Sequence, residues 1–114
     1  MRTKTLAVLA AALAGCTSQA NLERNPPMEL RTGKSAEDYR VCLIAKLEKD
    51  GRHTDVRPQG NNQRVLVESK VPSATAAIID IASASRGTRV QLREQMPNNP
   101  LRPRDVLVAV KDCL

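Results

Sequence analysis

The sequence contains almost no aromatic residues. Tyr39 is the only aromatic side chain among 114 residues, and phenylalanine and tryptophan are absent. Sites for sugars and for single-stranded nucleic acid usually depend on aromatic side chains against which the ligand stacks, so we expect no nucleic-acid partner. A core made only of Leu, Ile, Val and Ala buries less area per residue, and so small a domain would gain from a covalent cross-link.

The residues that usually carry catalysis or hold metals are equally scarce. His53 is the only histidine, and the chain contains no Gly-x-Ser-x-Gly sequence around a nucleophilic serine. The five glycines are not clustered as a phosphate-binding loop requires, and the aspartates lack the spacing of a calcium loop. A Ser-His-Asp arrangement would have to use His53, and a lone histidine at a strand start is usually only exposed. We therefore predict no enzyme, catalytic residue, metal or cofactor.

No apolar run near the start of the sequence is long enough to stay in a membrane. Residues 6–13 form an unbroken apolar stretch of eight, whereas a spanning helix needs ~20. Arg2 and Lys4 precede this stretch, and small residues follow it. This order is typical of a secretory signal peptide. The alternative is the N-terminal helix of a cytosolic protein with a buried cysteine.

At the end of this stretch, the sequence Leu13-Ala14-Gly15-Cys16 resembles the lipobox of bacterial lipoproteins. The resemblance implies cleavage before Cys16, attachment of diacylglycerol to its thiol and acylation of the new amine. Each buried lipid methylene contributes ~0.8 kcal/mol, so such an anchor binds a membrane firmly. Thr17 stands where an aspartate would favour the inner membrane. The resemblance therefore implies the periplasmic side of the outer membrane, with the inner membrane less favoured.

These assignments divide the chain into three segments. Residues 1–15 are the predicted signal peptide. Residues 16–34 are the lipidated cysteine and a flexible tether, because this stretch contains Asn, Pro-Pro and Gly without hydrophobic periodicity. Residues 35–114 form a predicted single domain, and the length available permits no second one.

Hydrophobic periodicity predicts a helix, four short strands and a second helix in this domain. Ser35 is a typical N-cap, and Gly51 is typical of the position after a helix C-terminus. The strands are predicted at residues 53–57, 64–70, 75–84 and 88–94. The alanines of the third strand also permit a helix. The last helix covers residues 103–113, with Pro103 in its first turn. The predicted fold class is α+β, an antiparallel meander of about four strands with both helices on one face.

Two cysteines remain once Cys16 is assigned to lipid. Cys42 and Cys113 each lie at the border of the apolar face of a predicted helix, and a secreted domain is exposed to oxidising conditions. Two helices on one sheet face would bring these thiols together, so we predict a disulfide that links the helices. The alternative is a pair of buried free thiols.

The basic residues are mostly arginines. The chain has a formal net charge of +6, which falls to +4 when Arg2 and Lys4 leave with the signal peptide. Alternation in the last strand directs Arg89 and Arg93 to its exposed side, and Arg57, Arg64 and Arg86 can lie nearby. The simpler interpretation is a charged face that opposes aggregation. The alternative is an anion-binding face formed by Arg57, Arg64, Arg89 and Arg93.

Taken whole, the chain resembles the small lipoproteins of Gram-negative bacteria, with a lipobox, a short tether and a cysteine in each of two helices. Our leading hypothesis is a non-enzymatic envelope lipoprotein whose domain faces the periplasm and binds another protein. The second hypothesis is an anion-binding module for lipopolysaccharide phosphates or acidic glycans. Both hypotheses include the membrane as a partner through the lipid on Cys16.

Overall fold

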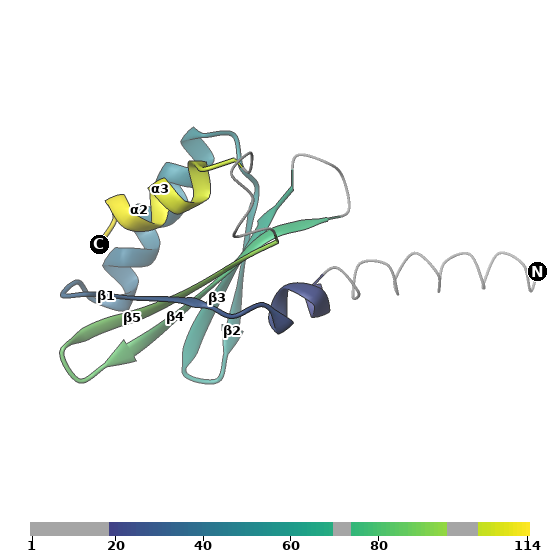
Figure 1. The fold of residues 1–114 in the computed structure, drawn as a ribbon. Helices are drawn as coiled ribbons and strands as arrows, with labels where there is room; N and C mark the ends of the chain where they lie inside the picture. The colour runs from purple at the N-terminus through teal and green to yellow at the C-terminus, as the bar shows by residue number, and fades with distance from the viewer. Residues whose placement is uncertain (1–18, 70–73, 96–102) are drawn as a thin grey trace, which may run out of the picture.

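A five-stranded antiparallel sheet forms the centre of the molecule, with two helices on one of its faces (Figure 1). The computed structural model describes residues 19–69, 74–95 and 103–114. The strands lie in the order β1-β5-β4-β3-β2. Their bounds are Met28–Thr32 for β1, Thr54–Gln59 for β2, Asn62–Glu68 for β3, Thr75–Ala84 for β4 and Gly87–Glu94 for β5. Helix α2 covers Ala36–Lys49 and α3 covers Asp105–Asp112, which confirms the predicted α+β class with both helices on one face.

Helix α2 begins and ends where the sequence indicates. The Ser35 side chain accepts a hydrogen bond from the backbone N–H of Asp38 at 3.1 Å, which satisfies one of the free donors of the first turn. Gly51 follows the helix with a φ of 79°, a conformation that favours glycine. Tyr39, Leu43 and Leu47 lie fully buried on the face toward the sheet. Local signals therefore determine this helix.

The segment that permitted either a strand or a helix is a strand. In β4, Ala77, Ile79 and Ile81 enter the main core, whereas Ile78 belongs to a separate cluster on the other face of the sheet. Three β-branched isoleucines favour an extended chain that is covered on both sides. A two-residue turn then leads into β5 at Gly87, where a Cβ would overlap the carbonyl oxygen of Thr32.

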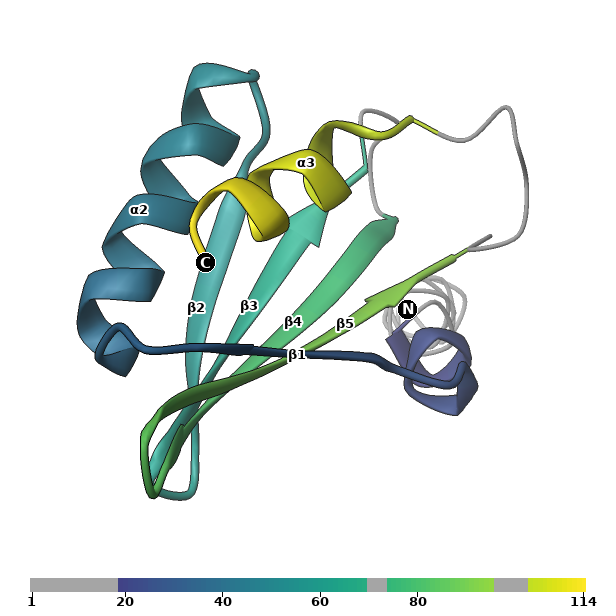
Figure 2. The ribbon, with the colours of Figure 1, turned by 60° about the vertical axis from the view of Figure 1, so that its left-hand side comes forward.

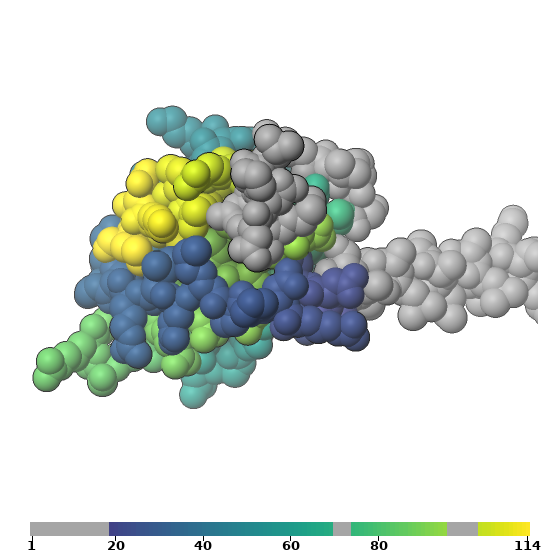
Figure 3. All heavy atoms as spheres, viewed as in Figure 1, coloured from purple at the N-terminus to yellow at the C-terminus, as the bar shows by residue number. Residues whose placement is uncertain are grey.

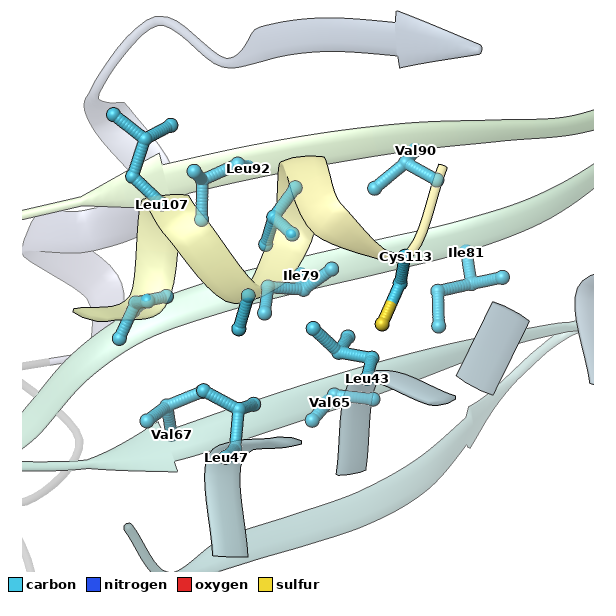
Figure 4. Packing of buried hydrophobic residues seen from close by; sticks show 14 of the residues in the cluster. Leu43, Leu47, Val65, Val67, Ile79, Ile81, Val90, Leu92, Leu107 and Cys113 are labelled. Atoms are coloured by element: carbon cyan, nitrogen blue, oxygen red, sulfur yellow. The ribbon is translucent and has the colours of Figure 1, made fainter. Parts of the chain in front are cut away.

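The main core lies between the sheet and the two helices. Figure 4 shows Leu43 and Leu47 of α2 directed toward Val65 and Val67 of β3, with Cys113 nearby. The single aromatic residue joins the helices, because the buried Tyr39 hydroxyl donates to the Val110 carbonyl oxygen at 2.9 Å. Burial raises the pKa of this hydroxyl well above its ordinary value, so it remains a donor.

A disulfide joins Cys42 of α2 to Cys113, the C-cap residue of α3, as predicted. The two Cα atoms lie 5.8 Å apart, within the range that a disulfide requires. The alternative of two free thiols is wrong. The bridge closes the long loop between Cys42 and Cys113. In the chain-entropy treatment, a cross-link that closes so long a loop stabilises a fold by roughly 4 kcal/mol.

The predicted tether is wrong for most of its length. Residues 19–24 are helical, and Met28–Thr32 form β1, which pairs with β5 from Met28 opposite Leu92 to Thr32 opposite Thr88. The Thr32 hydroxyl also donates to the Leu114 carbonyl oxygen at 2.7 Å. This stretch is a strand because it pairs with the side of β5 that faces away from β4. The sheet therefore has five strands where we expected about four.

The second helix is shorter than predicted. It begins at Asp105, and Pro103 precedes the N-cap residue Arg104, so our placement of Pro103 in the first turn was wrong. The predictions for residues 1–18, which include the signal peptide and Cys16, and for Lys70 lie outside the described residues. Nowhere in the described ranges is there a helix of the length and apolarity needed to cross a membrane.

An ion pair joins the end of α2 to the start of α3. Arg52 donates to Asp105 through two nitrogens, Nε to Oδ2 at 2.6 Å and Nη2 to Oδ1 at 2.9 Å. Their side chains are only 5% and 23% exposed. The hydrogen bonds from Arg52 lower the pKa of Asp105 below its ordinary value, and those to Asp105 raise the pKa of Arg52. This bridge therefore fixes α3 against the rest of the domain.

We predict that Asp105→Asn lowers the free energy of unfolding at pH 7 by about 3 kcal/mol, because it leaves a buried guanidinium without its counter-charge. A carboxyl whose pKa is lowered by folding stabilises fully above its ordinary pKa of about 3.9. That contribution to stability is lost as the pH falls through the lower pKa that Asp105 has in the folded state. Urea unfolding should therefore show the gap between wild type and Asp105→Asn narrowing below about pH 4.

Asp112→Asn is the matched control for this prediction. Asp112 pairs with Lys46 at 3.5 Å, but both side chains are about half exposed. Such surface pairs contribute roughly 0–1 kcal/mol, so this variant should unfold almost like wild type at every pH. An Asp105→Asn variant that is as stable as Asp112→Asn would contradict the role assigned to the buried pair.

Candidate functional site: the open face of the sheet

The face of the sheet opposite α2 and α3 carries most of its charge, and we call it the open face. Side chains alternate along a strand, so residues next to those of the main core lie on this face. All four arginines of the predicted anion site lie here. They are Arg57 of β2, Arg64 of β3, and Arg89 and Arg93 of β5. Arg86 instead occupies the exposed turn before β5.

Asp80 of β4 is the centre of an ion-pair network on this face. Arg64 donates from Nε to Oδ1 at 2.7 Å and from Nη2 to Oδ2 at 3.1 Å. Arg93 donates from Nη1 to Oδ2 at 3.2 Å from the other side. The three side chains are only 14–20% exposed. The hydrogen bonds to Asp80 raise the pKa of Arg64, so its charge is strongly held.

The two other predicted arginines form exposed ion pairs. Arg57 contacts Asp55 on its own strand at 2.9 Å, and Arg89 contacts Glu29 of β1 at 3.8 Å. The side chains of all four residues are 45–56% exposed. Solvent screens such pairs, and they contribute little to stability.

Residues 19–25 cover one end of the open face, and we call them the N-terminal segment. Leu22, which is 1% exposed, packs against Leu66 of β3 and Ile78 of β4. Glu23 accepts a hydrogen bond from Arg64 at 2.7 Å, and the Asn25 side chain donates to the Glu94 carbonyl oxygen at 2.8 Å. Figure 2 shows this helical turn (purple) against the sheet, away from α2 and α3.

The charge balance of the open face decides what it can bind. Each arginine of the predicted anion site already contacts a carboxylate, so an incoming phosphate would have to compete with Asp55, Asp80, Glu23 or Glu29. Arg31 of β1 differs, because it is exposed, lies opposite Arg89 in the sheet and forms no ion pair with the described part of the chain. A surface with both signs of charge suits another protein surface better than an anion.

The structure also contains a polar hollow that the sequence analysis missed. It lies between the first turns of α2 and the β2–β3 turn, and Arg40, Gln63 and Ser83 help to line it. The Nε atom of Arg40 is buried there and has no hydrogen-bond partner among the residues that the structure describes. Strand alternation places Gln63 and Ser83 on the side of the core, where apolar residues are expected. Two polar residues at these positions were the sequence signal for the hollow.

The one histidine and the acidic side chains are the remaining candidates for chemistry. His53 lies exposed before β2. Across residues 19–69, 74–95 and 103–114, no group of three or more His, Cys, Asp or Glu side chains could hold a metal ion. Comparisons of the chain with protein-family models, curated proteins and solved structures find no match.

We predict that the two arginines of β5 differ in their effect on stability. Arg93→Gln removes hydrogen bonds to Asp80 and to the Asn25 carbonyl oxygen, and should lower the free energy of unfolding by about 1.5–3 kcal/mol. Arg89→Gln removes one exposed pair and should change it by less than about 0.5 kcal/mol. Thermal and urea unfolding of both variants measure this difference. Equal losses would show that the Asp80 network does not stabilise the fold.

Proposed function

We propose that this chain is a lipid-anchored, non-enzymatic envelope protein whose domain faces the periplasm and binds another protein. The observation that carries the proposal is the disulfide between Cys42 and Cys113. It accounts for two of the three cysteines and leaves Cys16 at the end of Leu13-Ala14-Gly15-Cys16. Structural disulfides are typical of oxidising compartments, so the bond and the signal-like N-terminus support the same location.

The N-terminal segment supports an anchor that lies close to the domain. Only Thr17 and Ser18 separate Cys16 from Gln19, the first described residue of the helical turn that packs on the sheet. Three residues span at most ~10 Å, much less than a flexible tether of the expected length would reach. We therefore propose that the domain lies against the membrane surface, on the periplasmic side of the outer membrane.

The paired charges of the open face support a protein partner. The alternative, a module for lipopolysaccharide phosphates or acidic glycans, needs the arginines to exchange their carboxylates for the anion. For Arg64 this would break two hydrogen bonds to Asp80 and one to Glu23. Exposed strand edges and mixed charges instead offer main-chain hydrogen bonds and complementary pairs to a protein.

We predict that the wild-type protein isolated from cells carries a lipid on Cys16 and that Cys16→Ser does not. Intact mass spectrometry should give a chain that begins at residue 16 with added acyl mass, and the protein should partition into detergent. The serine variant should lack this mass because serine has no thiol to which diacylglycerol can be attached. As a control, Cys42→Ser should keep its lipid. A wild-type chain without lipid would contradict the anchoring proposal.

A further inference from the structure

Strand β1 leaves one side of the sheet open. Among the strands of the described ranges it pairs with β5 alone, and β2 is the other edge strand. An edge strand presents a row of unpaired backbone N–H and C=O groups that can accept another strand. In Figure 3, β1 (dark blue) runs along the visible surface between α3 (yellow) and β5 (green).

The register shows which residues of β1 direct their backbone groups away from the sheet. Ala84 and Gly87 flank the two-residue turn between β4 and β5, so they form a hydrogen-bonded pair. Hydrogen-bonded and non-hydrogen-bonded pairs alternate from there, which directs the backbone of Val90 toward Leu30 of β1. The N–H and C=O groups of Glu29 and Arg31, the neighbours of Leu30, therefore point outward.

The sequence Glu29-Leu30-Arg31 is complementary to itself. If a two-fold axis passes beside Leu30, an antiparallel copy of β1 sets Glu29 opposite Arg31 of the copy and Arg31 opposite its Glu29. Both of these pairs fall at the outward-pointing backbone positions, so they form hydrogen-bonded pairs of the new ladder. The two opposite-charge pairs also stabilise the contact.

The charges within the single chain favour this contact. Arg31 lies directly opposite Arg89 of β5, and like charges at opposite positions destabilise a sheet. Glu29 reaches Arg89 only at 3.8 Å, and Arg31 has no ion-pair partner in the described part of the chain. Glu29 of a second copy would supply a carboxylate to Arg31.

The other edge of the sheet does not offer the same contact. Gln59 and Asn62 flank the β2–β3 turn, so Pro58 lies at a position whose nitrogen points outward. Proline has no N–H to donate, which removes a hydrogen bond from any ladder along β2. Asp55 and Arg57 of this strand already pair with each other at 2.9 Å.

We infer that β1 pairs with β1 of a second copy of this chain, antiparallel about Leu30, and joins the two sheets into one. The contact is isologous, because the same residues contribute from both chains. This inference gives the proposed protein-binding function a partner, and it does not depend on the lipid anchor.

Cysteine cross-linking in the full chain tests the inference. The two Leu30 residues form a non-hydrogen-bonded pair at the axis, where Cα atoms lie ~4.5 Å apart, within the range of a disulfide. Leu30→Cys should therefore give a covalent dimer on a non-reducing gel of cell extracts. Val56→Cys is the matched control, because Val56 is also half-buried against the core and lies in the other edge strand. Its dimer yield should be at least about fivefold lower.

Charge reversal tests the register in the Leu30→Cys background. Adding Arg31→Glu places carboxylates opposite one another and should lower the dimer yield at least about fivefold. Adding Glu29→Arg as well exchanges the two charges and should restore the yield. Peptide mapping of the Cys42–Cys113 bond shows that each variant has folded.

Equal yields from Leu30→Cys and Val56→Cys, or no recovery after the charge exchange, would overturn the inference. Cross-linking of Leu30→Cys to a protein of another mass would also overturn it. That last result would leave the proposed protein-binding function standing, so the two proposals fail separately.

Discussion

The disulfide between Cys42 and Cys113 is the constraint on which the rest of this structure depends. The core contains no Phe or Trp, and its one aromatic residue links α2 to α3 through a single hydrogen bond. Small domains are stable by only about 5–15 kcal/mol, so a cross-link that contributes roughly 4 kcal/mol is a large share of the total. It holds α2 and α3 beside each other on one face of the sheet. The open face and the edge of β1, which we discuss as binding surfaces, are the parts of the sheet that this arrangement leaves uncovered.

Those surfaces have different parts in the proposed function. The open face is largely neutralised by its own ion pairs, and the N-terminal segment covers one end of it through Leu22. Because this segment is bound to the sheet, the proposed lipid on Cys16 would hold the domain close to the membrane. The outer edge of β1 pairs with no strand in the described part of the chain, and it has a self-complementary charge pattern. A pair of chains joined there would carry two anchors, and two anchors hold an assembly on a membrane more firmly than one.

Local signals made α2 and β5 predictable, because an N-cap serine and strict alternation each determine structure within a few residues. The segment that forms β4 permitted a helix as well, and the cysteine pair followed from placing two helices on one face of the sheet. Strand β1 was missed because a five-residue stretch after Pro26-Pro27 has no strong pattern of its own, and it becomes a strand only by pairing with β5. The predicted arginines were located on one face, but their carboxylate partners were not foreseen. Arg64 and Asp80 lie opposite each other only through the register of two strands, which a sequence does not state.

Unfolding of the purified protein before and after reduction tests the central claim most directly. The protein isolated without reductant should contain no free thiol at Cys42 or Cys113, and reduction should lower its free energy of unfolding by about 2–4 kcal/mol. Hydrogen exchange in the same samples should increase most in α3, which is the shorter helix and ends at the bridge. Two free thiols in the untreated protein, or an unfolding midpoint that does not change on reduction, would contradict the account.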